Sequence, residues 1–289
     1  MANTRINYFS VADIDLQQLA GNESHVLDNA DLSIIINGRP ADSTFLREGE
    51  IYQIPEPRLL LVMNGDADIQ LDLEHYHIHR GTLILTTPDM ILEFGRCSPD
   101  AALCGIAVKD GVQPAESIVT ETTANDFEQL LRMMHLLWDI ASQQPYRHDT
   151  VQQLLAAMLS NVRYIKQAAD DARRADAPTR SQQLFLMFKK LVSQHCERER
   201  NIPFYASLLH VSPHHLSAIV SKASGQSVMY WINRAVALRA KLLLQTTDLL
   251  TYEIAERLHF ANPPAFNNFF KRETGMTPRT YRNHKSGTL

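Results

Sequence analysis

Cysteine is scarce in this sequence, and long apolar runs are absent. The three cysteines, Cys97, Cys104 and Cys196, include no CxxC pair, so neither a disulfide framework nor a zinc ribbon is predicted and we expect buried free thiols. No apolar run approaches the roughly 20 residues that a membrane-spanning helix needs. Met1–Gln17 has neither the basic nor the apolar segment of a secretory signal. We therefore expect a soluble, cytoplasmic protein without a membrane partner.

Charge is distributed unevenly, although the net charge is only −4. Residues 1–177 carry 13 Lys and Arg against 26 Asp and Glu, a net charge of −13, whereas residues 178–289 carry 15 against 6, a net charge of +9. A basic domain attracts polyanions through phosphate contacts and counterion release, and an acidic domain is repelled by them. The two parts are therefore expected to have different partners. Charge alone is equally compatible with a solvated basic face that binds no nucleic acid.

The acidic part combines a β region with two helices. Eight short apolar segments between Leu32 and Val108, separated by Gly, Pro, Asn and Asp, predict a sandwich or a small barrel. Asn64-Gly65 lies between two of these segments and predicts a type I′ hairpin. Residues 124–168 follow helical periodicity with one apolar stripe on each of two segments, which predicts an antiparallel helical pair. The two stripes could pack on the β region or form a dimer seam.

The basic part contains an internal repeat with an offset of 50 residues, in which Ser212-Pro213 matches Asn262-Pro263 and Gly225 matches Gly275. In each copy the Ser or Asn is a helix N-cap, the Pro fits the first helical position, and the Gly fits the position after the helix ends. A short helix and a tight turn precede each cap. A helix, a turn and a second helix in a basic domain predict a helix-turn-helix, whose second helix lies in the major groove of DNA.

The helices expected in this part are Pro203–Leu209 and Pro213–Lys222 in the first copy, Tyr252–Leu258 and Pro263–Arg272 in the second, and Val228–Leu244 between them.

The segments LLHVSPHHLSAIVSKASGQSVMYWI and AERLHFANPPAFNNFFKRETGMTPRTYR resemble the AraC/XylS family of transcription regulators. FFKRETGMTPRTYR is similar to the C-terminal signature of that family, and the resemblance covers nearly all of Arg180–His284. It implies a domain with two recognition helices that binds double-stranded DNA.

The resemblance extends more loosely to the acidic part. In this family the commonest partner of such a domain is a cupin-like β-barrel followed by a helical pair, and GTLILTTPD (Gly81–Asp89) is similar to one step of that barrel. The resemblance implies a transcription regulator, either an activator or a repressor, that acts as a homodimer. A barrel of this size could hold a small-molecule effector, and RNA polymerase is a further implied partner.

The predicted fold class is therefore α+β: an N-terminal cupin-like β-barrel with a helical pair, then an all-α double helix-turn-helix domain. We predict a regulatory and dimerisation domain over residues 1–168, a linker over residues 169–180, and an AraC-type DNA-binding domain over residues 181–289. The linker stretch is charged and lacks large apolar residues, as expected of an exposed connection.

Several recognition-helix positions depart from the family's usual pattern. Many members have arginine where this sequence has Ala218 and Asn268, and glycine is usual where it has His259. Arginine best reads guanine, whereas the amide of asparagine matches N6 and N7 of adenine. The candidate base-contacting residues are His214, Ser217, Asn267 and Asn268, and the candidate phosphate contacts are Lys222, Lys271 and Arg272. His215 and Asn262 complete the candidate DNA-binding set. Alternatively, His214 and Ser217 only solvate their helix.

Two other functions compete with a DNA-binding regulator: a cupin-type metalloenzyme with a DNA-binding tail, and an architectural DNA-binding protein whose β domain only dimerises. The HYHIH run places His75, His77 and His79 on one face of a predicted strand, where they could bind a metal. A cupin site would also need a glutamate shortly downstream and a histidine after Pro88, and both are missing. The sequence also lacks GxSxG, HExxH and P-loop motifs, so we expect no enzyme activity, no metal and no cofactor.

Overall fold

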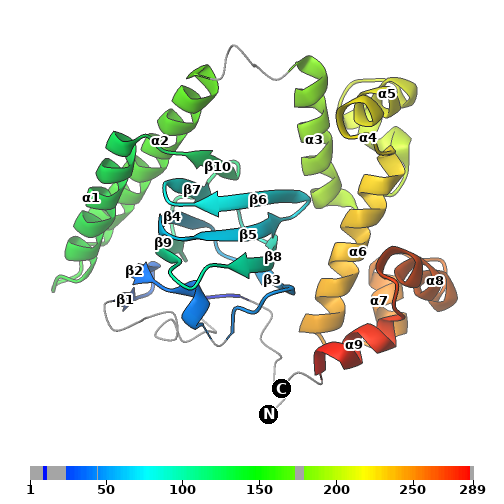
Figure 1. Ribbon diagram of the computed structural model, residues 1–289, viewed down its shortest axis with the longest axis horizontal. Coiled ribbons are helices and arrows are strands. Elements are labelled where there is room, and N and C mark those ends of the chain that lie inside the picture. The colour runs from blue at the N-terminus through cyan, green and yellow to red at the C-terminus, as the bar shows by residue number, and fades with distance from the viewer. Residues whose placement is uncertain (1–8, 12–23, 44, 173–178, 287–289) are drawn as a thin grey trace. The chain divides into compact units, whose positions relative to one another are not determined.

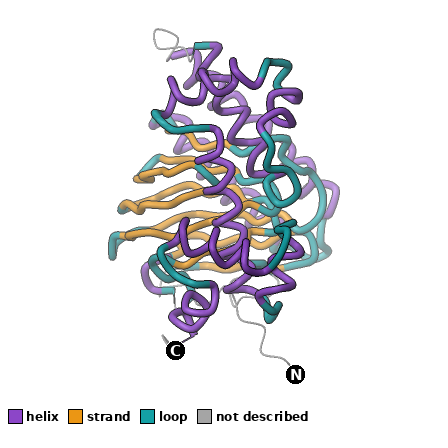
Figure 2. The backbone as a smooth tube through the Cα atoms, turned by 90° about the vertical axis from the view of Figure 1, so that its right-hand side faces the viewer, coloured by secondary structure: helices purple, strands orange, loops and turns teal. Residues whose placement is uncertain are grey.

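The computed structural model describes residues 9–11, 24–43, 45–172 and 179–286. They divide into two compact units, an N-terminal unit built from residues 9–71 and 75–172 and a C-terminal unit built mainly from residues 179–286. Figure 2 shows the strands in the first of these and helices throughout the second. The predicted linker, 169–180, includes residues 173–178, which lie outside the described residues. The predicted domain boundaries stay predictions.

The N-terminal unit contains ten strands and two long helices among its described residues, and every strand expected from the sequence is present. The strands are β1 (His25–Asp28), β2 (Leu32–Gly38), β3 (Glu50–Ile54), β4 (Arg58–Asn64), β5 (Asp66–Leu71), β6 (Glu74–His79), β7 (Thr82–Leu85), β8 (Met90–Cys97), β9 (Ala102–Val108) and β10 (Ile118–Glu121). The helices are α1 (Ala124–Ala141) and α2 (His148–Ala172), and a short 3₁₀ turn covers Pro40–Asp42. The sequence pattern missed β1 and β10, which are four residues each.

The predicted α+β class is confirmed, and the strands form two antiparallel sheets, as in the predicted sandwich, rather than a closed barrel. One sheet has the order β1-β2-β9-β4-β7-β10 and the other has the order β3-β8-β5-β6. Among the described residues each outermost strand pairs on one side only, so no ladder joins the sheets into a barrel. The barrel prediction is wrong because alternation of apolar residues shows that one face of a strand is buried but does not show which strands pair.

The hairpin predicted at Asn64-Gly65 is also wrong. The strands on either side of this pair, β4 and β5, belong to different sheets and do not pair with each other. Gly65 has a φ of +69°, and a Cβ atom there would lie 2.6 Å from the Cα atom of Ala101. The glycine therefore forms a tight corner at which the chain crosses from one sheet to the other.

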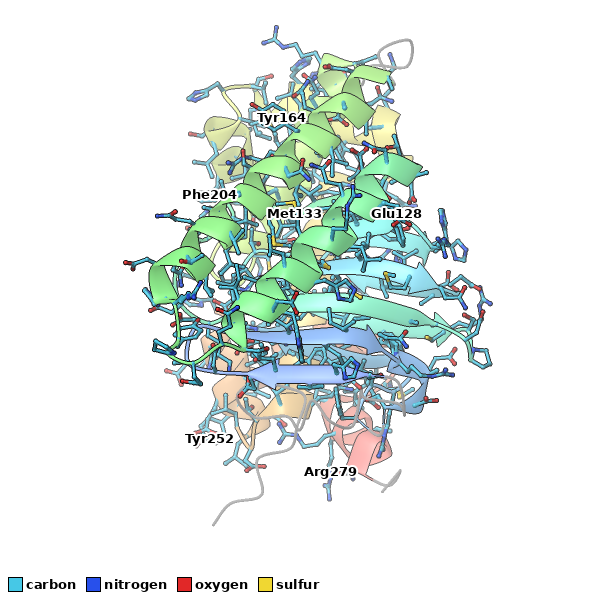
Figure 3. All side chains as sticks on the ribbon, turned by 90° about the vertical axis from the view of Figure 1, so that its left-hand side faces the viewer. Glu128, Met133, Tyr164, Phe204, Tyr252 and Arg279 are labelled. Atoms are coloured by element: carbon cyan, nitrogen blue, oxygen red, sulfur yellow. The ribbon has the colours of Figure 1, made fainter. Side chains whose placement is uncertain are left out.

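The six-stranded sheet is buried on both faces. Alternate residues of its strands, such as Leu32 and Ile34 of β2, pack with α1 and α2 in one apolar cluster, whereas the intervening residues face the four-stranded sheet. Figures 1 and 3 show α1 and α2 lying side by side across the outer face of this sheet. The apolar stripe of each helix is therefore core within one chain rather than a dimer seam.

The C-terminal unit is built from seven helices among its described residues. They are α3 (Arg180–His195), α4 (Ile202–Leu208), α5 (Pro213–Ser224), α6 (Val228–Thr246), α7 (Thr251–Arg257), α8 (Pro263–Thr274) and α9 (Pro278–Ser286). Side chains from all seven share one apolar cluster, which includes Phe188, Leu216, Ile232, Phe266 and Tyr281. In the part of the chain that the structure describes, no helix is both long enough and apolar enough to cross a membrane.

The expectation of buried free thiols holds for two of the three cysteines. All three are free, with Cys104 and Cys196 buried and Cys97 half-buried. Burial raises the pKa of Cys196 to about 12, because the thiolate would have to be held away from water. This thiol therefore stays protonated at neutral pH and is a packing residue.

Candidate nucleic-acid interface

The first helix-turn-helix consists of α4, a short turn and α5. Ser212 caps α5, because its side chain accepts a hydrogen bond from the main-chain nitrogen of His215 at 3.1 Å, and Pro213 opens the helix as predicted. Gly225, with a φ of +69°, ends it. Leu216, Ile219 and Val220 are buried, so the opposite face of α5 is left for a partner.

The second helix-turn-helix repeats this arrangement with α7 and α8. Asn262 caps α8 by accepting a hydrogen bond from the main-chain nitrogen of Ala265 at 2.9 Å, and Gly275 ends the helix at a φ of +78°. Phe266, Phe269 and Phe270 are buried at the spacing of Leu216, Ile219 and Val220 in the first copy. The predicted caps and both predicted C-terminal glycines are confirmed.

The two copies differ by one residue in the turn. Helices α4 and α7 begin at Ile202 and Thr251, an offset of 49, whereas α5 and α8 begin at Pro213 and Pro263, an offset of 50. Both turns use a histidine in the left-handed conformation, His210 at a φ of +54° and His259 at +53°. Each turn also reverses through a main-chain hydrogen bond to the preceding short helix, from Val211 to Ala206 in the first copy and from Phe260 to Ala255 in the second.

Helix α6 connects the two copies and contacts α3 and α5 as well as α7, α8 and α9. Its 19 residues correspond to a length of about 28 Å at 1.5 Å per residue. Recognition helices that enter successive major grooves of B-DNA are about 34 Å apart. A linker helix of this length is therefore suited to presenting two recognition helices to one face of DNA.

The candidate DNA-binding residues of α5 are at the surface. His214, His215 and Lys222 are exposed and Ser217 is half-buried. The Ser217 hydroxyl donates to the carbonyl of Pro213 at 2.9 Å, so only its lone pairs are available to a base. Ser221 is exposed one helical turn after Ser217; the sequence analysis missed it, although i, i+4 spacing places the two on one face.

The candidates of α8 are also exposed, but they are not equivalent. The side chains of Asn267, Asn268 and Lys271 have no hydrogen bond or ion pair among the described residues. Arg272 instead donates from Nε and Nη2 to Glu273 at 2.9 and 2.8 Å. A phosphate would have to compete with this carboxylate, so Lys271 is the better candidate phosphate contact. Asn262 is at the surface too, with its side-chain oxygen engaged as the cap of α8.

The three histidines of β6 lie away from the recognition helices in sequence and face solvent. His75, His77 and His79 are exposed, while Tyr76 and Ile78 between them pack against the apolar cluster between the sheets. The Nδ1 atom of His77 lies 2.8 Å from a carboxylate oxygen of Asp68. Among the described residues no three histidine, cysteine or acidic side chains are grouped as metal ligands.

A cavity lies between the two sheets of the N-terminal unit. Its volume is about 130 Å³, and its wall is almost entirely apolar, with Leu60 and Val62 from one sheet facing Ile69, Leu92 and Phe94 from the other. Engineered apolar cavities of about 150 Å³ stay dry and bind benzene. The space therefore suits a small ligand with an apolar body.

Arg58 is the buried cation in the wall of this cavity, with only 6% of its surface exposed. Its guanidinium lies 3.9 Å from the centroid of the Phe9 ring and 3.7 Å from the carboxylate of Glu56, and its Nε has no hydrogen-bond partner. Burial lowers the pKa of Arg58 to about 10, against the opposing effect of Glu56. The cavity thus contains one incompletely paired cation.

Comparison with known proteins gives the C-terminal unit a family. Residues 205–284 match the family model of a helix-turn-helix domain. The uncharacterized HTH-type transcriptional regulator YtdP of Bacillus subtilis is 33% identical over 95 residues, which are 33% of this chain and 12% of that protein. The uncharacterized HTH-type transcriptional regulator YijO of Escherichia coli is 24% identical over 139 residues, 48% of this chain and 47% of that protein.

The matches to these curated relatives span less than half of their length. Among solved structures, ToxT from Vibrio cholerae is matched over 92% of this chain and 99% of that chain, with 13% sequence identity and a TM-score of 0.39. The matched residues, 205–284, include both capped recognition helices and lie entirely in the basic part of the sequence. Residues 205–284 of this chain are therefore a helix-turn-helix domain of the AraC type.

Proposed function

We propose that this protein is a transcription regulator that binds double-stranded DNA through α5 and α8. The observation that carries the proposal is the presence of two capped recognition helices, each with an exposed polar face, on one core in a part of the chain with a net charge of +9. Lys222 and Lys271 supply phosphate contacts, and His214, Ser217, Asn267 and Asn268 face base edges.

The test is selection of bound duplexes from a random pool with the full chain, followed by titration of the enriched duplex at several salt concentrations. We expect one enriched sequence and an affinity that falls steeply with salt, because phosphate contacts release counterions. Recovery of no enriched sequence, together with binding that does not respond to salt, would contradict the proposal. The enriched sequence could then be sought upstream of genes to find what is regulated.

The N-terminal unit is proposed to bind a small-molecule effector in the cavity between its sheets. Support comes from the apolar wall and from the incompletely paired Arg58, which favour a ligand with an apolar body over a sugar, whose hydroxyl groups would lose their hydrogen bonds to water. An effector should change the affinity of the full chain for its selected duplex. A ligand that binds the cavity can be found because it raises the melting temperature. If the protein is only architectural, such a ligand will leave its affinity for the selected duplex unchanged.

Dimerisation is proposed to use the outward face of α1 and α2, with a second copy of this chain as the partner. The inward stripes are covered by the sheet, but Leu136 and Tyr164 are 47% and 73% exposed on these helices. Figure 3 shows Tyr164 and Glu128 on the outer side of the helical pair. Sedimentation of the full chain and of Met1–Asp176 should show concentration-dependent association that Leu136→Glu and Tyr164→Glu weaken. A strictly monomeric chain at high concentration would refute it.

A further inference from the structure

Arg200 joins the two helix-turn-helix copies inside the C-terminal unit. It lies in the loop between α3 and α4, directly before Asn201, the N-cap of α4. Its Nη2 atom donates a hydrogen bond to the main-chain carbonyl of Leu258, the C-cap residue of α7, 58 positions further along the chain. Its guanidinium also lies over the ring of Phe260, with 3.8 Å between Cζ and the ring centroid. One side chain thus connects the start of the first copy with the turn of the second.

The contact continues from this turn into the second recognition helix. The Phe260 ring centroid lies 5.2 Å from that of Phe266 and 5.0 Å from that of Phe269, and both of these side chains are buried on α8. Close-packed interiors transmit strain between side chains that are in contact. A displacement of the Arg200 loop would therefore be transmitted to α8.

The contact is directional, in contrast to the apolar packing around it. The Leu258 carbonyl is at the end of a helix, where carbonyl groups lack intrahelical partners and the helix dipole favours a cation. A charge-assisted hydrogen bond to it sets both a distance and an angle. The long helix α6 also links the copies, mainly through apolar side chains, which set orientation less tightly. Arg282 of α9 makes a similar contact elsewhere, because it donates to the carbonyls of Leu244 and Leu249 at 3.2 and 2.7 Å, but both of these acceptors lie between the two copies in the chain.

Arg200 also has a cost that packing alone would not require. Its Nε is buried without a hydrogen-bond partner, and burial lowers the pKa of its guanidinium. An unsatisfied buried donor destabilises a fold, and an apolar side chain of similar size would avoid that penalty. The arginine is therefore better explained by the position that it imposes than by the stability that it adds.

We propose that Arg200 is a positioning residue that sets the separation and relative rotation of α5 and α8, and with them the spacing between the two DNA half-sites that these helices read. The proposal rests on the proposed DNA-binding function. One base pair added between half-sites moves them by about 3.4 Å and rotates them by about 34°, so a rigid pair of recognition helices accepts only one spacing. A loosened pair accepts several spacings with a lower affinity for the best one.

The experiment measures the affinity of the full chain for its selected duplex and for versions with one or two base pairs inserted or deleted between the half-sites. For the wild-type chain we expect affinity to fall about tenfold or more with each change of spacing, because a half-site then loses its contacts. Arg200→Ala should bind the original duplex about tenfold more weakly, because the substitution removes the preorganisation of the two recognition helices. Its affinity should fall little further when the spacing between the half-sites changes. Arg200→Lys keeps the charge but loses the planar fork, and should give an intermediate profile.

Arg198→Ala is the matched control, because Arg198 is exposed in the same loop and its loss removes the same charge. It should keep the wild-type dependence on spacing. If the Arg200→Ala profile has the wild-type shape, even with a lower overall affinity or melting temperature, Arg200 is merely structural and the proposal is wrong. Should Arg200→Ala fail to fold, the profile of Arg200→Lys decides by the same criterion. A wild-type chain that selects no duplex would instead remove the proposed function itself.

Discussion

At the scale of single residues, the chemistry of α8 predicts which base is read. Asn268 is exposed and has no partner among the described residues, so its amide is available to N6 and N7 of adenine. Asn268→Ala should cost about 1–3 kcal/mol of binding free energy on the selected duplex and relax selectivity at one position, measured by titration against single-base variants. If the selected sequence is unchanged, recognition rests instead on Asn267, His214 or DNA shape.

Lys271 provides the comparison on the same helix. Lys271→Ala should weaken binding to all duplexes alike and reduce the slope of log affinity against log salt by about one, because one phosphate contact is lost. Titration of the two variants across several sequences and salt concentrations separates the two roles. A sequence-dependent loss in Lys271→Ala would contradict the assignment of this residue to phosphate.

His259 predicts a gain in stability on substitution. It adopts a φ of +53° in the second turn, a conformation that costs a residue with a Cβ atom about 1–2 kcal/mol relative to glycine. His259→Gly should raise the free energy of unfolding by up to about 1 kcal/mol, because the greater freedom of glycine in the unfolded chain offsets part of the relief. His210→Gly, in the first turn, should behave alike. A lower melting temperature in both variants would show that the histidines make compensating contacts.

At the scale of elements, the start of α2 is tied to the start of β2 through a titratable cluster. Asp31 accepts hydrogen bonds from the hydroxyl of Tyr146 and from Nδ1 of His148, both at 2.7 Å. Burial disfavours the ionised form of Asp31, but these hydrogen bonds outweigh it and lower the pKa of Asp31. The hydrogen bond and charge of Asp31 in turn raise the pKa of His148.

The directions of these pKa shifts determine the pH range over which Asp31 and His148 stabilise the fold. The contribution of His148 is fully present below the unfolded pKa of histidine, about 6.5, and is lost as pH rises through its raised folded pKa. The contribution of Asp31 is present above the unfolded pKa of aspartate, about 3.9, and is lost as pH falls through its lowered folded pKa. His148→Gln should therefore lower the melting temperature more at about pH 5.5 than at about pH 8.5.

His135→Gln is the control for this prediction, because His135 is an exposed histidine on the neighbouring helix α1 and has no contact of this kind. Its effect on the melting temperature should not depend on pH. Equal losses for His148→Gln at both pH values would show that protonated His148 adds nothing to the anchoring of α2.

At the scale of the whole molecule, the C-terminal unit should fold and bind DNA by itself. Its seven helices share one apolar cluster, and its net charge of +9 is opposite to that of residues 1–177, −13. The fragment Thr179–Leu289 should melt cooperatively and bind the selected duplex with an affinity that falls steeply with salt. Met1–Asp176 serves as the control and should not bind. Absence of a cooperative transition, or binding insensitive to salt, would contradict the prediction.

The sequence by itself determined the architecture of the DNA-binding part. The caps at Ser212 and Asn262, the glycines Gly225 and Gly275, and the periodic apolar residues are local signals, readable because each acts within a few residues of its place in the chain. The repeat with its offset also identified the two recognition helices, and therefore the surface on which the candidate site lies.

Only the tertiary structure decided which distant segments meet. Asn64-Gly65 has the local preference of a hairpin, yet β4 and β5 belong to different sheets, because strand pairing depends on neighbours far away in sequence. The hydrogen bond from Arg200 to Leu258, 58 positions further along the chain, likewise depends on how the helices pack. Local preference determines elements, whereas burial of apolar area and pairing of buried polar groups across the chain decide how they are joined.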